Sequence, residues 1–280
     1  CAEAPRVRAR PAPAGAAPTT GAAPAAPASR YSEAPSLAAL VAEGKLPPVD
    51  ERLPAEPFVV GPGVLVYEED LDWEVGEYSR EGEILRSVDV SPTWSYACQH
   101  ACEHFLNTPT HHTGPATGNL LSSWSVNEDC TQYEFTLRQG LKWSDGVPVT
   151  TEDIRFTYED VLLNEELTPV FPDKLRAGAT PGAEPMKVEI VDDFTWRVTF
   201  AEPNGTRFLC DDMGMGNLWA CYTALLKPKH YLQQFHKDYA KPDELAAKIQ
   251  AAGLSAAEWH RLFLDEGGSW GGGDCETCVE

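Results

Sequence analysis

Cysteine and histidine side chains between positions 98 and 112 are the residues of this sequence that could do chemistry, because thiolates and imidazoles are ligands that zinc prefers. They are Cys98, His100, Cys102, His104, His111 and His112. We expect a helix from Ala97 to Leu106, in which residues two apart lie nearly opposite each other because each residue advances about 100°. Only two ligands could then converge from the helix, and one of the later histidines would have to fold back. Buried thiols beside exposed imidazoles fit this spacing better, so we predict no metal and no other cofactor.

A second cysteine motif, C-x-x-C, is formed by Cys275 and Cys278. A redox motif of this kind sits at a helix N-terminus after a strand, and a zinc knuckle needs a second pair, but neither context is present. Of the eight cysteines, setting Cys1 aside leaves an odd number, which cannot all pair within one chain in an oxidising compartment. Cys210 and Cys221 are the pair that we would choose for a disulfide, although the connectivity stays open. A metal- or thiol-redox function is kept as the alternative.

The secondary-structure elements of the body are predicted from hydrophobic periodicity. Alternation from Thr131 to Arg138 places aromatic and leucine side chains on one face, as in a half-buried strand. Ser144–Gly146 has the composition of a tight turn. Thr150 or Thr151 then offers a hydroxyl cap to a helix of about three turns.

Other segments give weaker signals of the same kind. Ser255 with Glu258 has the spacing of a capping box, which predicts a helix start at Ser255. The segment that follows Gly44 is predicted to be an extended arm that packs on the body. We expect strands at 58–60, 63–67 and 84–90, a hairpin at 186–191 and 194–200, and helices at 37–42, 242–252 and 255–265.

Charge and composition limit the classes of function. The formal net charge of −21 argues against nucleic-acid binding, which requires clustered Lys and Arg. A chain of 280 residues with 42% hydrophobic residues can bury a sizeable core. Alanine and proline make up 18 of the first 30 residues, which predicts a tether rather than a fold.

The segment 119–160 carries a specific family resemblance. It contains Asn119-Leu-Leu-Ser-Ser-Trp124, the predicted strand, Lys142-Trp-Ser-Asp-Gly146 and the helix start Thr151-Glu-Asp153. In order and spacing it resembles the signature block of the peptide-type bacterial solute-binding proteins, the extracytoplasmic receptors of ABC importers. Leu226-Lys-Pro-Lys-His-Tyr231 extends the resemblance. Cys130 departs from it, because the family usually has glycine there, and we expect a looser reversal or another turn type.

The resemblance implies a fold and an organisation. The fold is α/β, a type II periplasmic-binding-protein-like lobe with a mixed sheet, incomplete because the second lobe is absent and the chain runs only about half the family's length. Trp124, Trp143 and Asp145 are then architecture rather than a site. The expected organisation is a lipid-anchor cysteine and tether at 1–30, a helix and arm at 31–57, the first lobe at 58–266 and a glycine-rich tail at 267–280.

The function implied by the resemblance is binding rather than catalysis. Such a protein captures peptides or a related small solute outside the cytoplasmic membrane and delivers them to the permease subunits of an ABC importer. The family places the chain around Trp94 and Tyr96 at the mouth of its ligand cleft, so these two are the predicted ligand contacts. Cys1 resembles the lipidated first residue of bacterial lipoproteins, which implies anchoring on the extracytoplasmic face, periplasmic or cell-surface. A truncated fragment that binds no ligand is a further alternative.

Overall fold

The computed structural model describes residues 31–58, 105–107, 116–205, 208–209, 213 and 225–267. The predicted strands at 63–67 and 84–90 lie outside these ranges, as do Val59 and Val60 of the strand predicted at 58–60. Among the described residues, no helix is both long and apolar enough to cross a bilayer.

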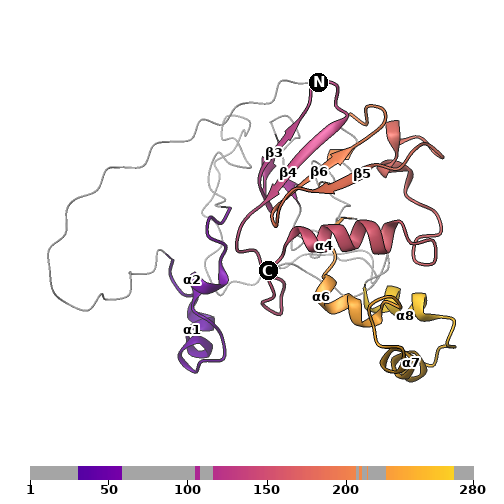
Figure 1. Cartoon of the computed structure of the whole chain (residues 1–280). Helices are drawn as coiled ribbons and strands as arrows, with labels where there is room; N and C mark the ends of the chain where they lie inside the picture. The colour runs from indigo at the N-terminus through magenta and orange to yellow at the C-terminus, as the bar shows by residue number, and fades with distance from the viewer. Residues whose placement is uncertain are drawn as a thin grey trace, which may run out of the picture.

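A four-stranded open sheet forms the centre of the molecule (Figure 1). Its order is β3-β4-β6-β5, with β3 at Leu121–Val126, β4 at Gln132–Leu137, β6 at Thr195–Thr199 and β5 at Lys187–Ile190. Every pairing within this described sheet is antiparallel. The strand predicted at 131–138 and the hairpin around Asp192 and Asp193 are confirmed, and so is the α/β class with an open sheet.

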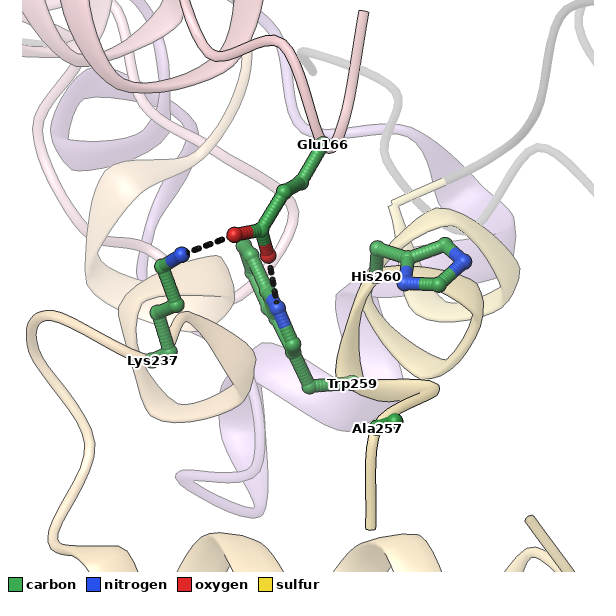
Figure 2. Close-up of a pocket in the computed structure, with 5 residues that line it drawn as sticks. All are labelled: Glu166, Lys237, Ala257, Trp259 and His260. Carbon is green, nitrogen blue, oxygen red and sulfur yellow. Dashed lines mark hydrogen bonds and ion pairs between the residues drawn. The ribbon is translucent and has the colours of Figure 1, made fainter. Parts of the chain in front are cut away.

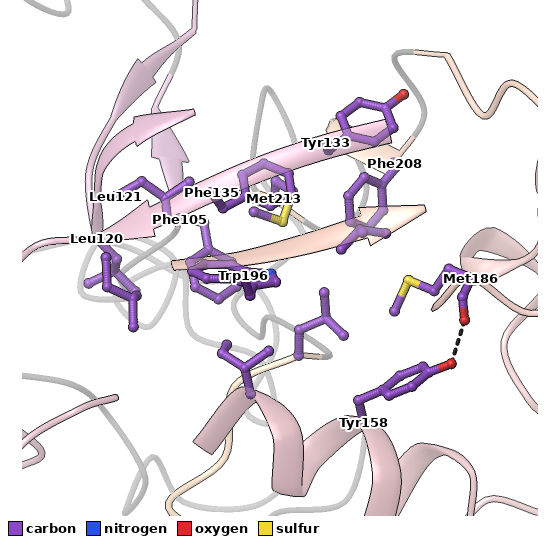
Figure 3. Close-up of a cluster of buried hydrophobic side chains, with 14 of the residues drawn as sticks. Phe105, Leu120, Leu121, Tyr133, Phe135, Tyr158, Met186, Trp196, Phe208 and Met213 are labelled. Atoms are coloured by element: carbon purple, nitrogen blue, oxygen red, sulfur yellow. Dashed lines mark hydrogen bonds between the residues drawn. The ribbon is translucent and has the colours of Figure 1, made fainter. Parts of the chain in front are cut away.

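Side-chain alternation along β4 and β6 builds the first hydrophobic core (Figure 3). Phe135 of β4 lies in register with Trp196 of β6, and the exposed fraction of both side chains is zero. Their rings are 5.3 Å apart, and Phe105 contacts Trp196 at 5.5 Å. Rings at these separations attract each other in addition to the gain from burying their area. This aromatic layer fixes the register of the sheet.

One helix separates this core from a second one. α4 (Thr151–Phe156) continues without a break into the π-helical turn η3 (Thr157–Leu162), which confirms a helix of the predicted length. Ile154 and Tyr158 pack against the sheet, and the Tyr158 hydroxyl donates to the backbone oxygen of Met186 (Figure 3). Phe156 and Val161 face the second core. The helix is therefore a wall shared by both cores.

Short helices on the far side of α4 make up the second core (Figure 1). They are α6 (Lys229–Leu232), η6 (Gln233–Phe235), α7 (Pro242–Ala251) and α8 (Trp259–Glu266). Two single turns, η4 (Asp173–Leu175) and η5 (Ala177–Ala179), connect α4 to the sheet, and the two-residue strands β1 (Leu106–Asn107) and β2 (Thr117–Gly118) pair beside it.

The N-terminal arm contains two helices, α1 (Pro35–Ala42) and α2 (Val49–Arg52). The first confirms the prediction at 37–42, whereas α2 was expected to be extended. The arm packs on the body as predicted, because Ala55 donates its N–H to the oxygen of Gln139 at 3.1 Å. The Arg138 guanidinium donates to the oxygen of Glu56 at 2.9 Å.

Two predicted helix boundaries are wrong. Leu106, the expected end of a helix from Ala97, lies in β1 and pairs with Gly118, while residues 97–104 lie outside the described ranges. The last helix begins at Trp259 rather than at Ser255. The Glu258 carboxylate accepts both the N–H and the hydroxyl of Ser255, and this local turn replaces the first helical turn.

Cys130 occupies the turn between β3 and β4 with a left-handed backbone, φ 53°. Its N–H donates to the oxygen of Asn127 at 3.1 Å, and the Asn127 side chain accepts from the next two amides at 2.9 Å. The looser reversal expected here is therefore not seen, because Cys130 adopts the conformation for which glycine is the usual residue. Cys130 is also disulfide-bonded, and the other seven cysteines lie outside the described residues.

We predict that Cys130→Gly is more stable than Cys130→Ala by about 1 kcal/mol, because only glycine adopts a left-handed backbone without a steric penalty. Both variants lack the disulfide, so their difference isolates the backbone term. Urea unfolding of the two variants measures it. Equal stability of the two variants would contradict a strained backbone at Cys130.

Candidate functional site

The residues predicted to touch ligand or lipid are not among those that the structure describes. Trp94, Tyr96 and Cys1 lie outside the described ranges, as do the six cysteines and histidines between 98 and 112 and the C-x-x-C at 275–278. The Cys210–Cys221 pairing lies outside them too. Within the described residues, no group of three or more Cys, His, Asp or Glu side chains could hold a metal ion.

The Asp153 carboxylate is the most deeply placed charge of the signature block, with an exposed fraction of 4%. One oxygen accepts from the Trp143 indole at 3.2 Å and from the Thr150 N–H at 3.1 Å, and the other accepts from the Lys229 N–H at 3.0 Å. Burial raises the pKa of Asp153, and these hydrogen bonds oppose the shift. A carboxylate with three donors can remain ionised in a buried position.

A second carboxylate holds the turn that precedes α4. Asp145 accepts the N–H of Val147 at 3.0 Å and contacts Nε2 of His230 at 2.6 Å. The backbone hydrogen bond from Val147, followed by the bond to His230, lowers the pKa of Asp145. Asp145 and Asp153 therefore tie the turn and the helix to α6. This supports the prediction that Trp143 and Asp145 are architecture.

Glu152 forms an exposed ion-pair cluster on the outer face of α4. It pairs with Arg155 and with Lys229, both at 2.8 Å, and Arg155 also pairs with Glu159 at 3.0 Å. The bond from Arg155, followed by that from Lys229, lowers the pKa of Glu152 to about 2. The cluster joins α4 to α6 at the surface above Asp153.

A shallow pocket opens over the second core (Figure 2). Its volume is about 480 Å³, and its lining is Glu166, Lys237, Ala257, Trp259 and His260. The Glu166 carboxylate lies between the Lys237 ammonium and the Trp259 indole N–H and accepts from both (Figure 2). The bond from Lys237, followed by that from Trp259, lowers the pKa of Glu166.

The chemistry of this pocket is limited by its internal pairing. Lys237 also lies over the Trp259 ring, 5.2 Å from its centroid, and the exposed fraction of Trp259 is only 6%. Little of the indole face is open for stacking against a ligand. The lining contains no hydroxyl or thiol nucleophile. The pocket could hold a small polar group, but its charges already neutralise each other.

No pattern in the sequence indicated this pocket. Glu166 precedes Lys237 by 71 residues and Trp259 by 93, so no local pattern joins them. The buried His236 ring contacts the Trp259 ring at 5.0 Å, and no local pattern joins these two residues either.

We predict that Asp153→Asn lowers the free energy of unfolding by about 3 kcal/mol, because an amide NH₂ would face donors and leave buried N–H groups unpaired. Urea denaturation measures the loss. Glu159→Gln, on the exposed side of the same helix, is the matched control and should change stability by less than about 0.5 kcal/mol. A loss below about 1 kcal/mol for Asp153→Asn would contradict the role given to this carboxylate.

The lowered pKa of Glu152 predicts that the stability of the folded protein depends on pH. Since its pKa is about 2 in the folded protein against an ordinary 4.5, its stabilising effect is present above pH 4.5 and is lost as the pH falls toward 2. Glu152→Gln should therefore lose less stability than the unmodified protein between pH 5 and pH 3. Unfolding curves at several pH values in this interval test the difference. Equal losses of stability in the two proteins would contradict a stabilising role of the Glu152 ion pairs.

Comparison with known proteins identifies a family and several relatives that this chain resembles. Residues 116–252 match the family described as bacterial extracellular solute-binding proteins, family 5 Middle. The periplasmic alpha-galactoside-binding protein of Rhizobium meliloti is 29% identical over 210 residues, which cover 68% of this chain and 28% of that protein. The periplasmic oligopeptide-binding protein OppA of Escherichia coli is 31% identical over 99 residues, covering 32% of this chain and 18% of that protein.

A solved structure supports the same relationship. An oligopeptide-binding protein OppA matches with a TM-score of 0.63 and 33% identity, covering 85% of this chain and 33% of that one. The chain thus spans about a third of the length of these relatives rather than the expected half. The relatives described here are named as an alpha-galactoside-binding protein and as oligopeptide-binding proteins. Residues 116–252 of this chain thus belong to the family 5 bacterial extracellular solute-binding proteins.

Proposed function

We propose that this chain is part of the substrate-binding lipoprotein of an ABC importer, which captures peptides or a related small solute outside the cytoplasmic membrane. The observation that carries the proposal is the match in fold and sequence to an oligopeptide-binding protein, with a TM-score of 0.63 at 33% identity. The complete protein delivers its solute to permease subunits. Cys1 carries the lipid that holds it at the membrane.

The disulfide at Cys130 supports an extracytoplasmic location. Disulfides persist in oxidising compartments and are rare in the cytosol, where thiols are kept reduced. The bond secures the turn that begins β4, the central strand of the first core. An exported protein gains stability from it where a cytosolic protein would not.

The solute class is proposed from the relatives. Those with the printed names oligopeptide-binding and alpha-galactoside-binding protein both match this chain, so one scaffold accommodates different solutes. We favour peptides because the structural match that carries the proposal is to an oligopeptide-binding protein. Trp94 and Tyr96 are the proposed ligand contacts, since aromatic side chains supply large contact areas with a polar end.

We predict that the 280-residue chain alone binds peptides weakly or not at all, because it spans about a third of its relatives. Isothermal titration calorimetry with a set of short peptides and an α-galactoside measures this. Micromolar or tighter binding would contradict the prediction.

The full product of the gene provides the test of function. It should bind members of the same peptide set, and Trp94→Ala or Tyr96→Ala should weaken that binding about tenfold, as for the loss of a buried aromatic contact. Glu159→Gln is a control on an exposed helix face that should leave binding unchanged. Binding of the galactoside but of no peptide would mean that the solute is a sugar rather than a peptide. Failure to bind any of these solutes would overturn the proposed function.

A further inference from the structure

Helix α1 contains one polar side chain, Ser36, and has no buried residue. Its eight residues, Pro35–Ala42, include no ionisable side chain. Leu37, Leu40 and Val41 share one face by their spacing of three and four residues. The exposed fraction of Leu40 is 39%, whereas Leu37 and Val41 are half-buried. Among the described residues, neither hydrophobic core includes a residue of this helix. The arm therefore presents a largely apolar helix that belongs to neither of the two described cores.

The ends of α1 are well formed, so its exposure is not a sign of fraying. Gly44 ends the helix with φ 68°, and the Gly44 and Lys45 amides donate to the oxygens of Val41 and Leu40 at 3.0 and 2.9 Å. These two bonds are those of a Schellman cap. Glu33 at the other end accepts the Val49 N–H at 3.1 Å and so joins the start of α1 to α2.

The surroundings of the helix are electrically balanced. Glu33 pairs with Arg52, and Glu43 pairs with Lys45 at 2.8 Å. The apolar face thus has a paired, neutral rim on a chain whose formal net charge is −21. An anionic membrane surface would repel the body as a whole, whereas a zwitterionic lipid surface would not.

Polar contacts hold the arm to the body and leave α1 projecting (Figure 1). The contacts are made by its later part, through the Ala55 N–H, the Glu56 oxygen and the Glu51 oxygen, which accepts from Lys142. The helix precedes these anchor points in the chain. In chain order, α1 therefore lies between Cys1 and the points that hold the arm to the body.

The position of α1 in the chain identifies what could cover it. It begins 34 residues after Cys1, and a flexible segment of that length spans about 30 Å on average. A lipid attached to Cys1 would therefore keep α1, on average, at a distance of this order from the bilayer. A contact too weak to matter in solution becomes effective when a tether raises the local concentration.

A second copy of the chain is a poorer occupant. A helix of eight residues is about 12 Å long, and two such faces bury far less than the roughly 1,200 Å² of a stable interface. Lipid requires no complementary partner surface. Burial of apolar side chains at the headgroup boundary is sufficient for interfacial helices.

We propose that α1 is a membrane-contact helix, whose Leu37, Leu40 and Val41 face enters the interface of the bilayer to which Cys1 is anchored. This inference rests on the proposed lipid anchor. The contact sets the distance and orientation of the arm relative to the membrane. The body above it remains free of lipid.

The test attaches the chain to phosphatidylcholine vesicles through a six-histidine tag in place of Cys1, bound to a nickel-chelating lipid. Hydrogen exchange at the amides of residues 37–43 is compared between tethered chain and untethered chain with the same vesicles. We expect exchange at least fivefold slower when tethered. Leu37→Asn with Leu40→Asn should abolish the slowing, and Ala39→Asn, on the opposite face, should preserve it.

Each other outcome has a defined meaning. Equal exchange in tethered and untethered chain would overturn the membrane contact. Slowing that appears without vesicles as protein concentration rises would also overturn it, in favour of self-association. Because the tag replaces lipidation, mass spectrometry of the natural N-terminal peptide tests the anchor separately. An unlipidated Cys1 would contradict that part of the proposed function without changing the vesicle result.

Discussion

The buried Asp153 carboxylate is the interaction on which the described part of this protein depends. It accepts hydrogen bonds from the turn at Trp143, from the helix cap at Thr150 and from the start of α6 at Lys229. These segments belong to different parts of the fold and meet where α4 separates the two cores. An unpaired charge at this depth would be strongly unfavourable, so the three donors must be in place together. One carboxylate thereby couples the sheet to the helices below it.

Local patterns in the sequence were sufficient to predict β4, the hairpin of β5 and β6, and α4, but not the long-range contacts between elements. Alternation identified β4, and the pair Thr150 and Thr151 identified the start of α4, where Thr150 is the cap, because both signals lie within a few residues. The bond between Asp153 and Lys229 joins residues 76 apart and has no local signature. The start of α8 was misplaced because the Glu258 side chain bonded Ser255 in a turn, a choice that spacing alone does not reveal.

The family resemblance predicted the fold better than it predicted a site. Its most specific residues, Trp143 and Asp145, contribute to packing and turn geometry, as expected. The glycine usually found at Cys130 is explained by the left-handed backbone that this turn requires. The pocket of Glu166, Lys237 and Trp259 depends on contacts between distant segments and could not be predicted. Trp94 and Tyr96 remain predictions, since they lie outside the described residues.

Native-state hydrogen exchange in low denaturant measures the coupling through Asp153 most directly. We expect the Lys229 amide, bound to Asp153, and the Leu137 amide, bound to the oxygen of Phe194 in the sheet, to exchange with the same free energy through global unfolding. Exchange of Lys229 through an opening more than about 2 kcal/mol below that of Leu137 would mean that the two cores open independently. That result would contradict the central role of this carboxylate.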